Sequence, residues 1–188
     1  MIKSKLLVEE TKETTQIYEG DLLHVKKDSA TLPDGSVSTR EWIKHPGACA
    51  IVPVYENGEI MLIQQFRYPA QQIFLEVPAG KIDPGEKELN TAQRELREET
   101  GLEADHYQYI GHFYPCIGYS DEVIHIYTAW GLSHNASSED HDEFVENETL
   151  SFRQAMDLVD QGYINDGKTV VSLSRTWSWW QEHGPFKI

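Results

Sequence analysis

Three glutamates lie close together near the end of a predicted helix. Glu95, Glu98 and Glu99 belong to the stretch RELREETGL, which begins at Arg94. Glu95 and Glu99 are one helical turn apart and project from one face, with Glu98 beside them. Like charges at this spacing repel each other, so the stretch is either a solvated charged face or a site for a cation. Converging carboxylates are hard oxygen donors, which favour Mg²⁺ or Mn²⁺ over zinc.

The loop before this helix favours the cation site. From Gly80 onward the chain reads G-x5-E-x7-R-E-L-x-E-E-x-G-L, and every defined position is present. This pattern resembles the Nudix box of nucleoside-diphosphate-linked hydrolases. The resemblance implies that Glu95, Glu99 and the backbone carbonyl of Ala79 bind Mg²⁺, for which Mn²⁺ can substitute. It also implies that Glu86 and Arg94 form an ion pair that holds the loop to the helix.

The segments around the box are similar to one branch of that family, the ADP-ribose and nucleoside diphosphate sugar pyrophosphatases. The similar segments are REWIKHPGACAIVPV, LIQQFRYP, LEVPAGKID and FYPCIGYSDEVIHIY. The likeness implies metal-dependent hydrolysis of nucleoside diphosphate sugars (ADP-ribose, ADP-sugars, GDP-mannose type) to a nucleoside monophosphate and a sugar phosphate. The branch commonly has a proline where this chain has Ile117, which leaves the choice among these sugars open.

Four further residues receive candidate roles from the same resemblance. Arg67 matches an arginine that contacts the substrate diphosphate, and a planar guanidinium suits phosphate oxygens. Arg40 and Trp42 lie where the branch reaches the nucleobase, although a half-buried strand tryptophan is an alternative for Trp42. Glu76 is expected either to assist the metal or to hold a ribose hydroxyl.

The general base has several candidates. In some relatives a glutamate from a late acidic loop activates the attacking water, and SSEDHDEF offers Glu139 and Glu143. In others the base comes from the box helix, where Glu98 is available. Ser120 has no neighbouring base motif, so a nucleophilic serine is not expected.

Other functions within the same resemblance stay open. The chain could be another type of Nudix hydrolase, acting for example on dinucleoside polyphosphates. It could also be a non-catalytic module that binds ADP-ribose or a nucleotide sugar, although intact metal-binding carboxylates argue against this. The resemblance further implies a homodimer, with the N-terminal strands taking part in dimerisation and base contact.

The surrounding sequence predicts the elements that position these residues. Alternating residues around Asp34-Gly35 predict two strands joined by a turn, and Asn57-Gly58 predicts a second hairpin. A polar, acidic loop is expected over SHNASSEDHDEFVENE, and Ser151 with Gln154 predicts a capping box. Helices are predicted over about residues 86–100, 151–161 and 167–182. Strands are predicted over about residues 107–115 and 121–132.

This order predicts an α+β domain of the α/β/α sandwich type. A central mixed β-sheet is flanked by helices, as in the Nudix fold, and an N-terminal antiparallel sheet is added to it. We expect residues 1–45 to form the N-terminal β hairpin region and residues 46–188 to form the hydrolase domain.

Composition limits the remaining possibilities. The 188 residues carry a net charge of −15, which disfavours nucleic acid as a partner. Cys49 and Cys116 lack metal or redox spacing and are expected to be buried free thiols. His106, His112, His125, His134 and His141 show no ligand spacing and are expected in core or surface positions. We expect no signal peptide, no membrane partner and a cytoplasmic location.

Overall fold

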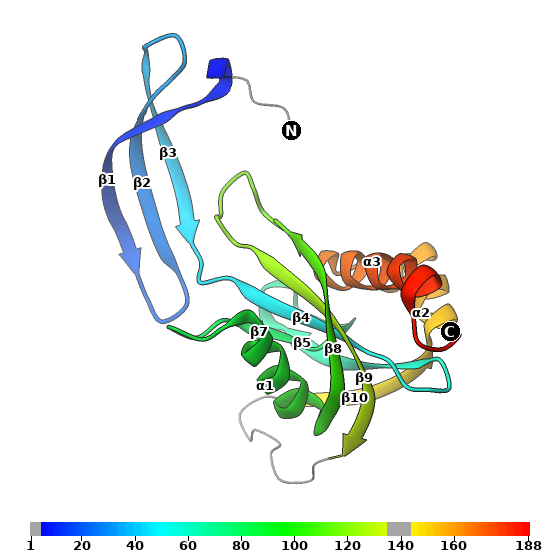
Figure 1. Ribbon diagram of the computed structural model, residues 1–188. Coiled ribbons are helices and arrows are strands. Elements are labelled where there is room, and N and C mark those ends of the chain that lie inside the picture. The colour runs from blue at the N-terminus through cyan, green and yellow to red at the C-terminus, as the bar shows by residue number, and fades with distance from the viewer. Residues whose placement is uncertain (1–4, 135–143) are drawn as a thin grey trace. The chain divides into compact units, whose positions relative to one another are not determined.

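The computed structural model describes residues 5–134 and 144–188 of the chain (Figure 1). The chain divides into two compact units. One contains the chain up to His45 together with Cys116–Glu122, and the other contains Pro46–Pro115 and Val123–Ile188. The second unit therefore contains every residue of the box pattern.

The first unit is built on a three-stranded antiparallel sheet. After the short helix η1 (Lys5–Leu7), its strands are β1 (Glu10–Glu19), β2 (His24–Thr31) and β3 (Val37–Lys44). The hairpin predicted at Asp34-Gly35 is present, with Gly35 at a φ of 85° in the turn. β1 is a strand beyond the two that were expected. All of its residues are exposed, so the strand needs no apolar face. Its sequence therefore does not show the apolar alternation that indicates a half-buried strand.

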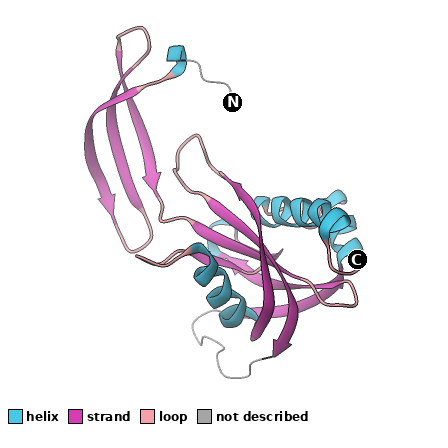
Figure 2. Cartoon of the chain, in the orientation of Figure 1, coloured by secondary structure: helices cyan, strands magenta, loops and turns pink. Residues whose placement is uncertain are grey.

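Two sheets form the centre of the second unit (Figure 2). The first has the order β7 (Ala79–Lys81), β4 (Ala48–Pro53), β9 (Ile124–His134) and β8 (Leu102–Phe113). The second has the order β10 (Val145–Ser151), β5 (Glu59–Arg67) and β6 (Gln72–Glu76). β4 and β9 run parallel and all other neighbours run antiparallel, so the predicted mixed sheet is confirmed.

Two connections differ from the predicted ones. The turn at Asn57-Gly58 is present, but it does not join two strands of one hairpin. Val54 and Ile60 form a single bridge beside the turn, and β4 and β5 belong to different sheets. Residues 145–148 were expected in a loop, yet they begin β10, which pairs with β5 over its whole length. Because this strand is largely polar, its sequence resembles a loop; its backbone hydrogen bonds to β5 determine its conformation.

In the described part of this unit three α-helices cover the sheets, and a short helix η2 (Tyr68–Ala70) follows β5. The α-helices are α1 (Glu88–Thr100), α2 (Phe152–Asp160) and α3 (Gly167–His183). The predicted end of α1 is confirmed, since Gly101 adopts a left-handed φ of 67°. The capping box of Ser151 and Gln154 at the start of α2 is also confirmed.

Every residue of β4 is buried, because the strand lies between two apolar clusters. Ala50 and Val52 pack in the cluster that contains residues of α2 and α3. Cys49 and Ile51 point the other way, into the cluster that contains Ala92 and Leu96 of α1. Helices therefore pack on opposite faces of β4, which is the expected α/β/α arrangement. This packing fixes α1 against β4, the strand that pairs with β7.

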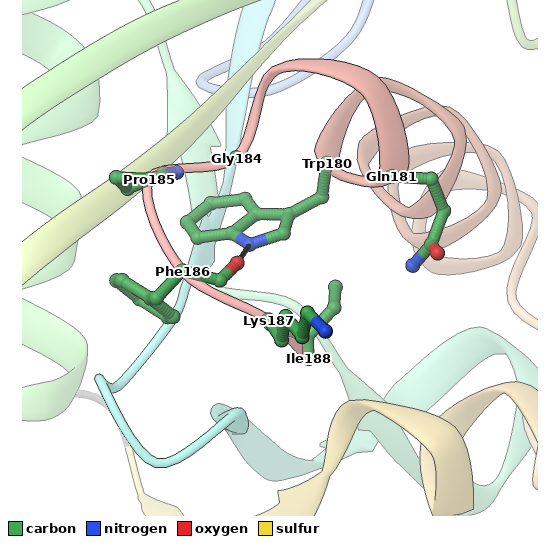
Figure 3. A pocket seen from close by; sticks show the side chains of 7 residues that line it. All are labelled: Trp180, Gln181, Gly184, Pro185, Phe186, Lys187 and Ile188. Atoms are coloured by element: carbon green, nitrogen blue, oxygen red, sulfur yellow. Dashed lines mark hydrogen bonds between the residues drawn. The ribbon is translucent and has the colours of Figure 1, made fainter.

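The C-terminal tail folds back onto α3 (Figure 3). Trp180 Nε1 donates a hydrogen bond of 2.9 Å to the carbonyl of Phe186. A hollow of about 520 Å³ lies here, lined by Trp180, Gln181 and Gly184 to Ile188. Among the described residues, none of the candidates named above lines it.

Both cysteines are free thiols. Cys49 is buried as expected, and its Sγ contacts the carbonyl of Glu88 at 3.1 Å. Cys116 is only partly buried, contrary to the expectation, and accepts a hydrogen bond from the Tyr119 hydroxyl. In the part of the chain that the structure describes, no helix combines the length and apolar character needed to cross a membrane.

Candidate active site

The second half of α1 presents its glutamates next to β7. Glu95 and Glu99 lie on the side that faces the strand and are only 8% and 6% exposed, whereas Glu98 is partly exposed. Glu99 Oε2 accepts a hydrogen bond of 2.8 Å from the backbone nitrogen of Ala79. One end of the box thus contacts the other, because α1 packs against the strand that begins the pattern.

The guanidinium of Arg94 lies among the carboxylates of the box. Its Nη1 donates to Glu95 Oε1 at 2.7 Å and to Glu98 Oε2 at 2.9 Å. Its Nη2 donates to Glu86 Oε2 at 3.1 Å and to the carbonyl of Lys81 at 3.0 Å. A single side chain therefore ties the loop to the helix and lies between like charges that would otherwise repel each other.

The ionisation of this group follows from these contacts. Hydrogen bonds from Arg94 hold the pKa of Glu86 below its ordinary value, and Thr91 adds a smaller effect in the same direction. In turn, the hydrogen bond to Glu86 raises the pKa of Arg94, with Glu98 and Glu95 contributing further. Glu86 and Arg94 are consequently both charged across the physiological pH range.

Gly80 leaves room for the carboxylate of Glu95. A Cβ atom built on Gly80 would overlap the Glu95 carboxyl group at less than any observed contact distance. The backbone of Gly80 does not require a left-handed conformation there, so the glycine is explained by space rather than by φ. The first glycine of the pattern and its second glutamate therefore depend on each other.

The donor chemistry of this site fits a hard divalent cation. Carboxylate oxygens and a backbone carbonyl are the ligands that Mg²⁺ prefers. Among residues 5–134 and 144–188, no three His, Cys, Asp or Glu side chains are arranged as a ready ligand set. Two carboxylate oxygens do meet at one cationic atom, Arg94 Nη1, which shows that this position favours positive charge.

A second group of charges surrounds Glu76, which is only 2% exposed. Arg67 donates to both of its oxygens, from Nε at 2.8 Å and from Nη2 at 2.7 Å. Lys168 Nζ donates to Oε2 at 2.8 Å. Burial acts to raise the pKa of Glu76, but the hydrogen bonds from Arg67 and the charge of Lys168 outweigh it and hold the pKa below its ordinary value.

Two members of this second group, Lys168 and Asp166, are not among the site residues that the sequence predicts. Asp166 caps α3 by accepting a hydrogen bond from the Thr169 nitrogen at 3.0 Å, and it also pairs with Lys168 at 3.3 Å. An aspartate just before a helix is a recognisable cap signal. The contact between Lys168 and Glu76 joins residues 92 positions apart, and no local signal indicates it.

Arg40 and Trp42 belong to the first unit, on β3. Arg40 pairs with Glu9, through Nη2 and Oε1 at 2.6 Å. Trp42 Nε1 donates to Asp28 Oδ2 at 2.9 Å, and Lys26 Nζ lies 5.4 Å from the centre of its ring. Trp42 thus already has a polar partner and a cation at its ring. The two remaining candidates, Glu139 and Glu143, lie outside the described residues.

Comparison with known proteins identifies relatives over most of the chain. The family model described as NUDIX domain matches residues 44–172. A methanol dehydrogenase activator from Bacillus methanolicus is 39% identical over 171 residues, which cover 90% of this chain and 92% of that protein. An ADP-ribose pyrophosphatase from Bacillus subtilis (strain 168) is 38% identical with the same coverage.

A solved structure extends the comparison to the fold. It is described as the crystal structure of ADP compounds hydrolase and covers 97% of this chain and 99% of its own, with a TM-score of 0.84. The sequence identity is 21%, so this likeness concerns the fold alone. It confirms the predicted α+β fold.

The buried pairing of Glu76 predicts a dependence of stability on pH. At pH 7 we expect Glu76→Gln to lower the free energy of unfolding by roughly 2 kcal/mol, because it removes the charge that pairs with two cations. Since the pKa of Glu76 is lowered from 4.5 in the folded state, its contribution is complete above pH 4.5. It is lost as the pH falls through the folded-state value.

Urea denaturation of both proteins across this pH range measures the difference. The difference between wild type and Glu76→Gln should narrow as the pH falls below 4.5. Glu86 and Asp166 titrate in both proteins, so they largely cancel in this comparison. The exposed Glu10→Gln serves as the control, for which the difference should stay small throughout. A difference at Glu76 that is independent of pH would contradict the proposed charge pairing.

Proposed function

The chain belongs to the NUDIX domain family, and on that basis we propose that it hydrolyses the diphosphate linkage of nucleoside diphosphate sugars with the help of a divalent cation. One observation carries the proposal: the complete box is folded so that Glu99 accepts a hydrogen bond from Ala79, and the Glu95 carboxylate occupies the space left by Gly80. The similarity to an ADP-ribose pyrophosphatase supports ADP-ribose as one substrate. The products would be a nucleoside monophosphate and a sugar phosphate.

We propose Mg²⁺ as the cation, with Mn²⁺ as a substitute, because the donors are hard oxygen atoms. Glu95, Glu99 and the carbonyl of Ala79 would hold it. When bound, the ion supplies positive charge to the diphosphate and makes a bound water more acidic. Arg94 keeps Glu95 and Glu98 together through Nη1, so the carboxylates need little reorganisation.

The proton acceptor for the attacking water is proposed among Glu98, Glu139 and Glu143. Glu98 is partly exposed and has one oxygen within 2.9 Å of Arg94 Nη1, so it lies at the edge of the box where water can reach it. Glu139 and Glu143 come from the segment outside the described residues and keep the role that the resemblance implies for them.

Arg67 is proposed to bind the diphosphate, but in the structure both Nε and Nη2 bond to Glu76. Turning toward a substrate would leave Glu76 buried, and a buried carboxylate without a partner is costly. Lys168 removes this obstacle because it is only 14% exposed and holds the same carboxylate. Arg67 is 40% exposed and is the partner that can leave. We therefore assign Lys168 as a positioning residue for Arg67.

Base contact and assembly are proposed on the resemblance. Arg40 and Trp42 would contact the nucleobase, and the chain would form a homodimer through its N-terminal sheet. Their present partners are Glu9 for Arg40 and Asp28 for Trp42. The relative from Bacillus methanolicus is described by an effect on another enzyme, not by hydrolysis. The intact box carboxylates favour hydrolysis for this chain.

The first test is hydrolysis of a panel of nucleotide sugars, including ADP-ribose and GDP-mannose, with Mg²⁺. Products resolved by phosphorus NMR in ¹⁸O-water would identify both the substrate and the phosphorus attacked. Glu99→Gln should lower turnover by roughly two to three orders of magnitude, since a metal ion contributes several kcal/mol of charge stabilisation. Glu103→Gln, just beyond the box, is the matched control. Undiminished turnover in Glu99→Gln would overturn the assignment, provided that circular dichroism shows both variants folded.

Gly80→Ala tests the space beside Glu95. Its Cβ would push the Glu95 carboxylate away from its present position, so the Mg²⁺ concentration for half-maximal activity should rise about tenfold or more. The control is Gly118→Ala, because a Cβ there meets no atom within 4 Å. An unchanged Mg²⁺ requirement in Gly80→Ala would show that Glu95 does not need this position.

Lys168→Met tests the exchange of Arg67. Without Lys168, Glu76 should retain Arg67, so KM should rise roughly tenfold or more, because hydrogen bonds between charged groups contribute about 1.5–3 kcal/mol. kcat should change much less. Lys168→Arg keeps the charge and should stay close to wild type.

The double variant Glu76→Gln/Lys168→Met separates this role from direct substrate binding. Removing the charge of Glu76 releases Arg67, so KM should recover relative to Lys168→Met. If Lys168 instead contacts the substrate itself, the effects of Glu76→Gln and Lys168→Met on KM will add, and KM will not recover in the double variant. Arg67→Met should lose the diphosphate contact in either background.

A further inference from the structure

Two histidines that are distant in the sequence lie opposite each other in the second unit. His112 of β8 pairs in register with His125 of β9, and their ring centroids are 5.8 Å apart. Neither residue belongs to the box or to the group around Glu76. Their proximity depends on strand pairing, which is why the sequence spacing shows no ligand pattern.

A β-bulge brings a third side chain to the pair. The register shifts between Tyr109 and Gly111, and Gly111 has a φ of 127° that favours glycine. Without the bulge, residues 109 and 112 would point to opposite faces of the strand. With it, Tyr109 opposite Tyr127 and His112 opposite His125 share one face.

Three donor atoms converge at this position. The hydroxyl oxygen of Tyr109 lies 3.1 Å from His112 Nδ1 and 3.2 Å from His125 Nδ1. The hydroxyl can donate its single proton to only one of the two nitrogens, so the other histidine must donate its own Nδ1–H. The Tyr109 oxygen therefore has one nitrogen of each imidazole within hydrogen-bond distance.

The separations match those around a tetrahedral metal ion. Bonds of about 2.0–2.1 Å place neighbouring ligand atoms about 3.3 Å apart, close to both measured separations. Tyr109 is 41% exposed, His112 is exposed and His125 is partly buried, so an ion could enter from solvent and keep an open position for water.

We propose that Tyr109, His112 and His125 form a binding site for a late first-row divalent metal ion, with Zn²⁺ as the expected ion. Imidazole donors select such ions over Mg²⁺, which prefers oxygen ligands. The site shares no residue with the carboxylates of α1. A bound ion would connect β8 and β9 beside the bulge and stabilise the folded state by mass action.

Titration with Co²⁺ tests the site through its visible absorption, with Zn²⁺ added afterwards to displace it. Excess Mg²⁺ in all samples occupies oxygen-rich sites such as the box. We expect one Co²⁺ per chain with the strong absorption of tetrahedral cobalt. His112→Gln and His125→Gln should each weaken binding at least tenfold, and Zn²⁺ should raise the melting temperature of wild type but not of these variants.

His106→Gln is the matched control, because His106 also lies on β8 but stacks on Trp130. It should bind Co²⁺ like the wild type. Tyr109→Phe keeps the ring and removes the oxygen donor, so it should weaken binding even if a histidine variant folds poorly. The proposal is overturned if the wild type shows no saturable tetrahedral signal, if the histidine and tyrosine variants keep it, or if Glu99→Gln abolishes it.

Discussion

The pairing of Arg94 with the carboxylates around it is the interaction on which the site depends. Glu95 is largely buried beside Glu98, and two such charges on neighbouring helical positions repel each other. One guanidinium bonds to both and also reaches Glu86 and the Lys81 carbonyl. Arg94 therefore stabilises the helix end and the preceding loop at once. The geometry of the loop and the charge of the helix cannot be altered separately, and this explains why the pattern spans both.

Glu76 also needs cationic partners, but it obtains them differently from the carboxylates of the box. This carboxylate is more deeply buried than those of the box, and it has two cationic partners from elements far apart in the chain, Arg67 at the end of β5 and Lys168 in α3. One partner would be locked in place by the cost of leaving a buried charge unpaired. With two partners, the more exposed one can exchange this contact for another anion. In the proposed exchange, Glu76 would keep Lys168 as a partner while Arg67 turns toward the substrate.

Local signals predict much of this structure, whereas contacts between distant segments are not predicted. The end of α1 at Gly101 and the cap at Ser151 depend on a few neighbouring residues, so the sequence indicates them. β1 and the first residues of β10 are polar, and only pairing with another strand defines them. The box was recognisable because its defined residues, from Gly80 to Leu102, lie in one continuous segment. The contacts of Glu76 with Lys168 and of His112 with His125 depend on packing and register, which composition and spacing do not encode.

This difference between local and distant contacts bears on how the chain relates to its family. The proposed cation site is built from one continuous segment that a relative can retain intact. Residues proposed to recognise the substrate come from more than one segment: Arg40 and Trp42 from β3, and Arg67 from β5. Each can change without disturbing the contacts of Arg94. Two relatives of nearly equal identity to this chain accordingly carry descriptions as different as dehydrogenase activator and ADP-ribose pyrophosphatase. Overall identity therefore does not decide between these two descriptions, and the side chains outside the box must be compared one by one.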